Sequence, residues 1–558
     1  MEKLPLGQLL LNFGYITEEQ IAVAVETQNI RKKLLGELLV EQSFVSPREI
    51  ALAISKQSGT PFLDVSEYRS SKEALGILSH NIAKQFEVLP LNVQGGVFSV
   101  AMSDPFDINA VDVLKRRAGM EVNIFVSDRD TILKRAEMLY YLLENPINVT
   151  IRSQIEQAYQ NNAIVSIPDF INGVINNALT ERATDIHISP EESVTHIFYR
   201  IDGILRHFYA CPKSMHASLV SRVKIISNMD ISEQRMPQDG AFAHVFFDES
   251  FDMRVSTLPT VFGESLVLRI LSKNLSLFNL EALGFREEVL KLIVKQFERT
   301  QGIVLVVGPT GSGKTTTLYA GLRKINSLQR RVLTIEDPVE YKFPFIMQTQ
   351  VNEKSGYNFN TAMRAFFRQD PDVILLGEMR DEHTAEMAFR SSITGHLVLS
   401  TMHTSDAVSS IPRLLDLNVK DYFVSSALSA VIAQRLLRKV CSFCARERAV
   451  TADYLLEIGY KRDMLDKLKI ESGSRVNLSY GDGCEYCHGT GYFGRTVISE
   501  LFIMDEELSD MIVRGQTPLA LTNAARSRGM VSMVEDGLMK SLTGVTNPEE
   551  VKRVVTWL

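Results

Sequence analysis

Ten residues near the middle of the chain, GPTGSGKTTT from Gly308 to Thr317, have the spacing of a phosphate-binding loop. An apolar run precedes them and a helix-forming run follows. Glycines let the backbone wrap a phosphate, so that its N–H groups and the positive end of the following helix face the negative charge. Lys314 is expected to reach the β- and γ-phosphates of ATP, and the Thr315 hydroxyl to bind Mg²⁺. The residues expected to contact the nucleotide are Gly308, Pro309, Thr310, Gly311, Ser312, Gly313, Lys314, Thr315 and Thr316.

Acidic residues and histidines flank apolar runs downstream of this loop. Glu336 and Asp337 end the run RVLTIED, Glu378 ends VILLGE, and His403 follows LVLST. Ligands of open α/β sheets lie at the carboxyl ends of strands, where a carboxylate can orient water or hold Mg²⁺ through water. We predict such roles for Glu378 and Glu336, and a γ-phosphate-sensing role for His403. His396 precedes the same strand and need not share that site, since a structural hydrogen bond explains it equally well.

Four of the five cysteines form two C-x-x-C pairs, Cys441 with Cys444 and Cys484 with Cys487. Two such pairs can close a tetrahedron of thiolates around Zn²⁺, and four thiolates leave no open coordination position. We therefore predict a structural zinc. Two redox pairs or plain buried thiols are the alternatives.

Three arginines, Arg200, Arg254 and Arg269, lie in a segment whose strand patterns predict a small α+β domain. Within it, Asp202-Gly203 is a hairpin-turn signal. An arginine from a neighbouring domain or subunit can neutralise the charge of a transferring γ-phosphoryl group, and we predict that role for these three. An ion-paired surface position is the alternative for each of them.

The chain of 558 residues is long enough for three or four domains. The element patterns divide it into a helical docking module over residues 1–60, an α+β domain over 61–143, a flexible linker over 144–162, an α+β domain over 163–285 and a nucleotide domain over 286–558 with a zinc arm at about 438–495. Between the cysteine pairs, residues 451–470 have the pattern of an amphipathic helix.

The first module contains an internal repeat. The stretch that begins at Leu6 returns from Leu35 with a constant offset. Each copy reads as two short helices, with Thr17 and Ser46 as the N-caps. A repeat that pairs its own apolar faces is a sufficient explanation.

The composition excludes several classes of protein. An apolar share of 45% with 23% charged residues is typical of globular domains. No apolar run approaches the roughly 18 residues that span a bilayer, and the first twenty residues lack the pattern of a signal peptide, so we expect a cytosolic protein. A net charge of −7 argues against general affinity for nucleic acid.

Several motifs together resemble the type II secretion and type IV pilus assembly ATPases. GPTGSGKTTTLYA, TIEDPVEY, RQDPDVILLGEMRD and TGHLVLSTMHT are similar to the family's Walker A, aspartate, Walker B and histidine boxes, and DIHISP, PQDG, QRLLRKVCSFC and CEYCHGTGYFGRTVISELF match other parts of the pattern. The resemblance covers most of residues 183–551. It implies a multidomain α/β and α+β chain: a RecA-like P-loop NTPase domain with a zinc-binding insertion, preceded by a PAS-like α+β domain and a docking domain.

The resemblance also implies a function. Family members act as hexameric cytoplasmic ATPases at the inner face of the plasma membrane, where an inner-membrane platform protein and a cytoplasmic segment of a membrane-anchored assembly protein are the expected partners. ATP, Mg²⁺ and Zn²⁺ are the expected cofactors. Pilus assembly, type II secretion and assembly of a DNA-uptake pseudopilus all use this kind of ATPase. A nucleic-acid translocase and a regulatory nucleotide-binding module are alternatives from other classes.

Some positions depart from the family pattern. Phe198, Ala241 and Ser265 stand where the family commonly has basic residues. The surface around the predicted arginines therefore carries less positive charge than in the family, and we expect slow hydrolysis. The repeat resembles a motif that binds cyclic di-GMP in some members, but Pro5 and Leu34 replace its two arginines. Because guanidinium groups are suited to guanine stacking and phosphate pairing, we expect weak or absent cyclic di-GMP binding.

Overall fold

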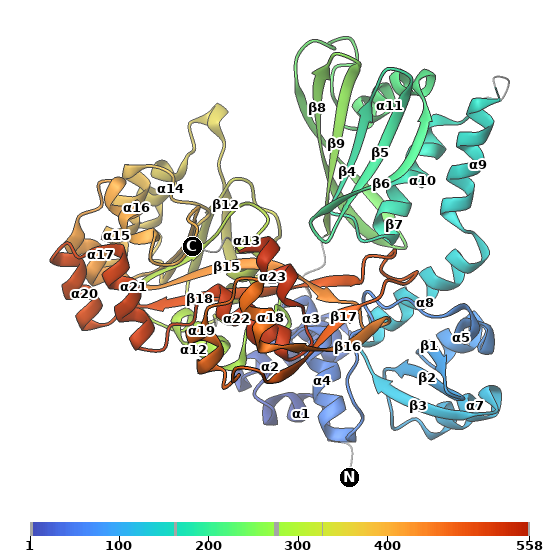
Figure 1. Cartoon of the computed structure of the whole chain (residues 1–558), viewed down its shortest axis with the longest axis horizontal. Helices are drawn as coiled ribbons and strands as arrows, with labels where there is room; N and C mark the ends of the chain where they lie inside the picture. The colour runs from blue at the N-terminus through green and yellow to red at the C-terminus, as the bar shows by residue number, and fades with distance from the viewer. Residues whose placement is uncertain (1–3, 161–164, 273–277, 326, 556–558) are drawn as a thin grey trace. The chain divides into compact units, whose positions relative to one another are not determined.

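The computed structural model describes residues 4–160, 165–272, 278–325 and 327–555. The chain divides into two compact units, residues 1–276 and 277–558, and each is described by itself (Figure 1). The boundary thus lies somewhat before the predicted start of the nucleotide domain at residue 286. Among the described residues, no helix combines the length and the apolar character needed to cross a membrane.

Unit 1 begins with the repeat. Its helices are α1 (Leu6–Asn12), α2 (Glu18–Arg31), α3 (Leu35–Glu41) and α4 (Pro47–Ser58). Thr17 and Ser46 each form a capping box, with Gln20 and Glu49 respectively, as the sequence predicts. The apolar faces of the two copies pack together around Leu9, Leu10 and Leu39, so the repeat builds one small core.

A small α+β segment follows. It contains α5 (Lys72–Ile77), α6 (His80–Gln85), β1 (Val88–Gln94), β2 (Val97–Met102), α7 (Ile108–Ala118), β3 (Glu121–Val126) and α8 (Arg129–Glu144). Strand β2 pairs antiparallel with β1 through the Gly95-Gly96 turn and parallel with β3. These elements agree with the predicted α+β character of this segment.

The predicted flexible linker is wrong for most of its length. Residues Ile147–Tyr159 form helix α9, which packs against α10 (Ile167–Thr180) (Figure 1). Ile151 and Ile155 lie one turn apart, and both are buried in the core of the following domain. The polar composition of this stretch concealed that apolar stripe. Residues 161–164, the last two of the predicted linker and the first two of the predicted α+β domain, lie outside the described residues.

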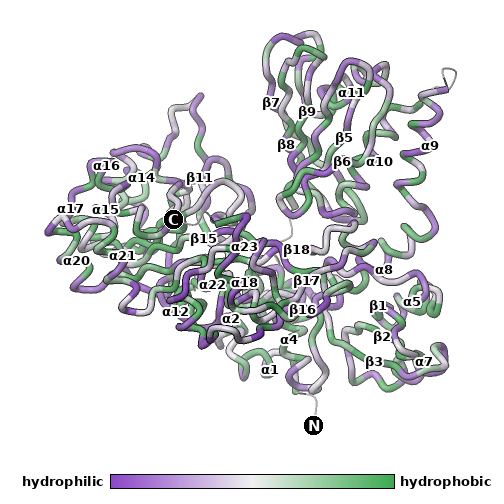
Figure 2. Tube along the Cα trace, viewed as in Figure 1, coloured by the Kyte–Doolittle hydropathy of each residue, from purple (hydrophilic) through white to green (hydrophobic). Residues whose placement is uncertain are grey.

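The second half of unit 1 is a six-stranded antiparallel sheet in the order β6-β5-β4-β9-β8-β7. Its strands are β4 (Asp185–Pro190), β5 (Val194–Ile201), β6 (Ile204–Pro212), β7 (Gln238–Phe246), β8 (Glu249–Thr260) and β9 (Gly263–Ser272). Asp202 and Gly203 both have positive φ and form the predicted hairpin turn between β5 and β6. Helices α10 and α11 (Lys213–Ile226) cover one face, burial alternates along β5, and the strands carry both polar and apolar colours (Figure 2).

Unit 2 is built on a seven-stranded sheet in the order β12-β11-β13-β14-β10-β15-β18, parallel except for the edge strand β18. The strands are β10 (Gly302–Val307), β11 (Val332–Glu336), β12 (Ile346–Gln350), β13 (Val373–Leu376), β14 (Leu397–Met402), β15 (Leu428–Val440) and β18 (Tyr492–Ile503). Strands β10, β13 and β14 are buried along their whole length, as expected of a parallel sheet covered on both faces.

Helices surround this sheet. They are α12 (Glu287–Phe297), α13 (Lys314–Leu322), α14 (Phe359–Phe366), α15 (Glu382–Ile393), α16 (Ser410–Asp416), α17 (Asp421–Ala427), α20 (Glu506–Val513), α21 (Pro518–Ser527), α22 (Met533–Leu542) and α23 (Pro548–Val554). The carboxyl ends of β13, β14 and β10 are neighbours in this order, so the segments that follow them meet at one edge.

The arm between the cysteine pairs differs from the predicted single helix. It contains a hairpin of β16 (Ala445–Thr451) and β17 (Arg475–Gly481), and between these strands two short helices, α18 (Ala452–Glu457) and α19 (Arg462–Lys467). The helices are separated at Gly459, whose φ of 107° is not compatible with a continuous helix. Leu455 and Leu465 still face one core, which explains the amphipathic pattern.

Candidate nucleotide site

The phosphate loop joins β10 to α13, and two of its glycines are required by the geometry. Gly308 has a φ of 149°, and a Cβ there would lie 2.6 Å from the carbonyl oxygen of Gln434. Gly313 is the residue before the first turn of α13 and has a φ of 88°. The loop therefore ends at the amino end of a helix, where backbone N–H groups lack helical partners and favour an anion.

Lys314 lies at the first position of α13. Its Nζ donates to the carbonyl oxygens of Gly308 at 2.8 Å and Pro309 at 3.2 Å. Burial lowers the pKa of Lys314, the carboxylate of Glu378 opposes that change, and the guanidinium of Arg435 adds to it. The side chain thus stays beside the loop that it is predicted to serve, next to an acid and a second cation.

Glu378 follows β13 and His403 follows β14, and the fold brings these two predicted residues together. His403 Nε2 lies 3.3 Å from Glu378 Oε1. The other carboxylate oxygen, Oε2, accepts from Arg380 Nε at 2.8 Å. The strand ends are also joined by the Thr401 hydroxyl, which donates to the carbonyl oxygen of Gly377 at 2.7 Å. The carboxylate is therefore held from both sides.

Glu336 ends β11, one strand further from the loop, and its surroundings differ. Its side chain is 4% exposed and accepts hydrogen bonds from the Tyr319 hydroxyl, from Thr334 Oγ1 at 2.6 Å and from Gln348 Nε2 at 3.2 Å. Burial and the adjacent Glu336 carboxylate raise the pKa of Tyr319, which keeps its proton for this bond. Glu336 thus ties β11 to α13.

His396 lies at the opposite end of β14 from His403. Its Nδ1 is 2.8 Å from the carbonyl oxygen of Ser391 and 3.2 Å from Thr394 Oγ1. The two histidines do not share a site, and the contacts of His396 are those of a structural hydrogen-bonding group.

Three further residues of the site were not predicted to have a chemical role. Arg380 contacts Glu378, whereas Gln434 and Arg435 reach the phosphate loop and the turn after His403. Gln434 and Arg435 belong to the motif QRLLR, so the resemblance contained them, but spacing alone does not show that a strand more than a hundred residues away contacts the loop.

The three predicted arginines of unit 1 form one row across neighbouring strands. Asp185 on β4 is opposite Arg200 on β5 and Arg269 on β9, and Arg269 is opposite Arg254 on β8. Residues directly opposite in a sheet project from the same face, so the row is continuous. Arg269 Nε donates to Asp185 Oδ1 at 3.0 Å, and Arg200 Nε lies 3.7 Å from Asp185 Oδ2. Asp185 thus holds two of the three arginines of this row, Arg200 and Arg269.

The departures from the family pattern lie on the same sheet. Ala241 is opposite Arg254, and Ser265 lies on β9 four residues before Arg269. Phe198 packs edge-on against His207, whose Nε2 is 3.0 Å from His196 Nδ1. Aromatic and imidazole rings therefore occupy the position next to Arg200 where a further arginine would add positive charge.

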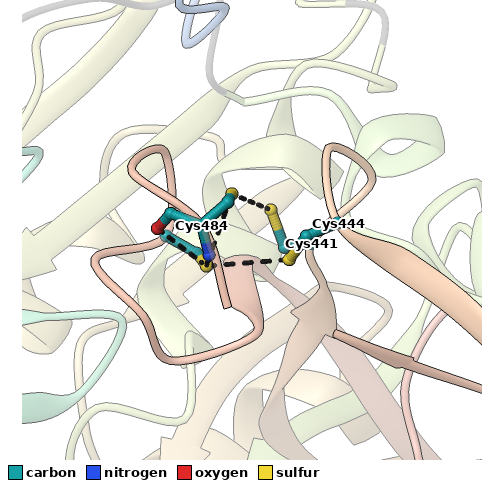
Figure 3. Close-up of side chains that lie close together, drawn as sticks. Cys441, Cys444 and Cys484 are labelled. Atoms are coloured by element: carbon teal, nitrogen blue, oxygen red, sulfur yellow. Dashed lines mark hydrogen bonds between the residues drawn. The ribbon is translucent and has the colours of Figure 1, made fainter. Parts of the chain in front are cut away.

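The four cysteines predicted to bind zinc converge in unit 2 (Figure 3). Their sulfur atoms all lie within 4.8 Å of one another. The Sγ atoms of Cys441 and Cys484 are 3.8 Å apart, as are those of Cys444 and Cys487. A tetrahedron with zinc–sulfur bonds of about 2.3 Å has sulfur atoms about 3.8 Å apart. The thiols therefore fit Zn²⁺, and they are too far apart for disulfide bonds.

The cysteine sulfurs have unequal surroundings. Burial raises the pKa of Cys441 and of Cys444. Burial also acts to raise the pKa of Cys487, but the N–H groups of Cys484 and Gly491 bond its sulfur at 3.1 and 3.2 Å and lower the pKa to about 6. A cation is the natural partner for four sulfurs gathered in this way, because metal binding stabilises the thiolate form.

A cavity of about 1100 Å³ lies in unit 1 between the second repeat copy and the β2–α8 region. Leu34, Gly36 and Ile54 contribute to its lining. Its charged lining residues are Lys33, Glu37, Glu41, Glu87, Asp128, Arg129 and Asp130, five acids and two bases. Acidic side chains thus outnumber basic ones in this lining, and weak cyclic di-GMP binding stays a prediction.

Two family models match the sequence. The model described as "Type II/IV secretion system protein" matches residues 160–553, which include the phosphate loop, Glu378, His403 and all four cysteines. A model of the MshEN domain matches residues 58–165. Together they cover most of both units.

Curated relatives align over most of the chain. A type IV pilus assembly ATPase, PilB of Myxococcus xanthus, is 34% identical over 562 residues, 98% of each chain. The type II secretion system protein E of Xanthomonas campestris is 37% identical over 86% of this chain and 84% of that protein. PilB of Thermus thermophilus is 38% identical over 89% of this chain, but the match spans only 56% of that longer protein.

Among solved structures, the Yersinia pseudotuberculosis ATPase DotB superposes with a TM-score of 0.51 at 18% identity. The superposition covers 69% of this chain and 93% of DotB. At this identity the likeness concerns the fold alone.

Proposed function

Because the chain belongs to the family of type II/IV secretion system proteins, we propose that it is an ATPase whose hydrolysis of ATP powers type IV pilus assembly or type II protein secretion. The observation that carries the proposal is the meeting of Glu378, His403 and the Lys314 loop at the carboxyl edge of one parallel sheet. A regulatory module that only binds nucleotide has no need of a carboxylate held beside a histidine at this place.

In the proposed mechanism, the loop N–H groups and Lys314 bind the β- and γ-phosphates. Mg²⁺, held by the Thr315 hydroxyl, would neutralise phosphate charge. Glu378, fixed by His403 and Arg380, accepts a hydrogen bond from the attacking water and aligns it with the γ-phosphorus. Inorganic phosphate and ADP are the products. His403 is placed to respond when the γ-phosphate leaves, since it contacts the same carboxylate.

The arginine row is proposed to act in an assembled homo-hexamer. Arg200, Arg254 and Arg269 would neutralise the γ-phosphate charge of a nucleotide bound to a neighbouring copy. Asp185 holds two of these arginines and leaves Arg269 58% exposed on its side chain. The substitutions at Phe198, Ala241 and Ser265 reduce the positive charge on this face, so turnover is expected to be slow.

The proposed location is the cytoplasm, at the inner face of the membrane. An inner-membrane platform protein and a cytoplasmic segment of a membrane-anchored assembly protein are the proposed partners, and pull-down of either from detergent extracts would separate pilus assembly, secretion and DNA uptake. The acidic net charge of −7 speaks against a nucleic-acid translocase. Filter binding of single-stranded DNA at physiological salt tests that alternative.

Phosphate release tests the central proposal. Lys314→Ala is expected to lose nucleotide binding, whereas Glu378→Gln should bind ATP but lose turnover by about a hundredfold or more. Glu353→Gln, an exposed acid in the same unit, is the matched control and should behave as wild type. An oligomer that binds ATP and releases no phosphate would contradict the proposal.

Cyclic di-GMP binding is a separate question, tested by calorimetry on the full chain. With Pro5 and Leu34 in place of arginines and an acidic cavity beside the second repeat copy, we expect no dissociation constant below the micromolar range. A tighter constant would overturn that expectation and leave the ATPase proposal untouched.

A further inference from the structure

Gln434 on β15 is a buried polar residue whose side chain bonds both the phosphate loop and the helix that follows it. It is 1% exposed. Its Nε2 donates to the carbonyl oxygen of Ser312 at 2.8 Å, and its Oε1 accepts from the Thr317 hydroxyl at 2.9 Å. Its backbone oxygen is the atom against which Gly308 packs. One side chain therefore fixes the loop and the first turn of α13 relative to β15.

Arg435, the next residue, reaches in another direction. Its Nη2 donates to the carbonyl oxygen of Ser405 at 2.7 Å, two residues after His403, and its Nη1 donates to the carbonyl oxygen of Gln434 at 3.0 Å. Burial lowers the pKa of Arg435, while the nearby acids Asp406 and Glu500 oppose that effect. A guanidinium remains charged under such conditions, so the two carbonyl contacts are charge-assisted.

The strand order of the sheet shows which segments these contacts connect. In the sheet, β10 lies between β14, which leads to His403, and β15, which carries Gln434. The loop after β10 and the turn after β14 are thus joined through residues of a third strand, across the end of β10. Glu500 supports the same turn from β18, because its Oε1 accepts from the Ala407 N–H at 3.1 Å.

We propose that Gln434 and Arg435 form a clip that couples the phosphate loop to the turn carrying His403, so that the groups on either side of the γ-phosphate keep one geometry during turnover. Both are positioning residues, since they act on main-chain atoms of the loop and the turn. The inference rests on the proposed ATPase function and adds two residues to it. It predicts that binding of the γ-phosphate, and not binding of the rest of the nucleotide, depends on Gln434 and Arg435.

A charge role and a purely stabilising role for the pair lead to different results. If Arg435 only adds positive charge near the phosphates, then lysine should replace it. If the pair only stabilises the fold, then its loss should lower the melting temperature and weaken ADP and ATP binding alike. A clip requires the forked geometry of arginine, because one guanidinium bridges two carbonyl oxygens that a single ammonium group cannot reach in the same way.

The experiment uses the full chain with the substitutions Gln434→Met and Arg435→Lys, alone and together. Met keeps the length of the glutamine without its hydrogen bonds, and Lys keeps the charge of the arginine. Gln296→Met and Arg330→Lys are matched controls. Gln296 is also buried but lies on α12, and Arg330 is half-buried before β11, at the amino edge of the sheet. Phosphate release, calorimetric affinities for MgADP and MgATPγS, and thermal melting are measured for each protein.

The clip predicts that Arg435→Lys lowers kcat by about 10- to 100-fold and weakens MgATPγS binding by about tenfold, while ADP affinity changes by less than about threefold. The double variant should be no slower than the slower single variant, because each change opens the same connection. Unchanged kcat in Arg435→Lys would overturn the clip in favour of a charge role. Effects that multiply in the double variant, or equal losses of ADP and ATPγS affinity, would overturn it as well.

Failure of the proposed function is separately visible. If wild type shows no phosphate release, the ATPase proposal fails, and the binding measurements still test the clip. In that case, the preference of wild type for MgATPγS over MgADP should shrink by about tenfold in the two single variants and remain in both controls. A preference that the variants retain would overturn the clip.

Discussion

The phosphate loop and the cysteine cluster are both built from short spacings in unit 2, but they are completed in different ways. The loop is held by protein groups, since Gln434 bonds Ser312 and Thr317 and Lys314 bonds the loop carbonyls. The cluster gathers four sulfurs at tetrahedral separations, and the backbone N–H groups of Cys484 and Gly491 bond the Cys487 sulfur. A similar spacing signal can therefore describe a site that the chain preorganises or a site that an ion must complete.

Loss of the cluster should give the largest effect. Cys487→Ser is expected to reduce bound zinc from one per chain to none, because three thiolates and a hydroxyl hold Zn²⁺ far less tightly, and metal binding supplies folding free energy to such sites. The arm should become sensitive to proteolysis. Atomic absorption and limited proteolysis measure these outcomes, with Cys211→Ser, a buried cysteine outside the cluster, as the control.

The same variant tests whether the two sites are independent. If the loop is preorganised by protein groups alone, then nucleotide affinity should survive the loss of zinc within about threefold. Unchanged metal content in Cys487→Ser would defeat the zinc proposal. A parallel loss of ATP affinity would show that the two sites depend on each other.

A smaller effect is expected in the loop from Gly308→Ala. The new Cβ would lie 2.6 Å from the Gln434 carbonyl oxygen, at a φ of 149°, so the loop must shift or β15 must move. Overpacking against backbone costs about 1–3 kcal/mol. Calorimetry should show weaker ATP binding, while the zinc content stays at one per chain.

Gly311→Ala is the control for this change. Gly311 has a φ of 80°, but a Cβ there would meet no described atom within 4 Å, so the substitution tests strain without the clash. If both variants bind ATP equally well, the contact between the loop and β15 is not what positions the loop.

The sequence contained the two spacing signals but little of what surrounds them. The loop, the cysteines, the Asp202-Gly203 turn and the repeat caps are local patterns, so they could be predicted. The contacts of Gln434 and Arg435 depend on strand order, and Asp185 acquires its role only because β4 lies between β5 and β9. Helix α9 was missed because two buried isoleucines were outweighed by polar neighbours.

The last effect concerns pH and the turn after His403. Burial raises the pKa of Glu500 from an ordinary 4.5 to about 7, although its bond from the Ala407 N–H opposes the change. Between pH 4.5 and 7 the folded chain therefore binds this proton more tightly than the unfolded chain, so the free energy of unfolding falls as pH rises through that window and is level above it.

Glu500→Gln keeps an acceptor for Ala407 and removes the titration. Denaturant unfolding at pH 5 and pH 8 should show the variant gaining stability relative to wild type at the higher pH, with Glu353→Gln as the control for lost charge. Since the effect belongs to the nucleotide site and not to the cysteine cluster, it should persist in the zinc-free Cys487→Ser background; an equal pH slope in wild type and Glu500→Gln would rule it out.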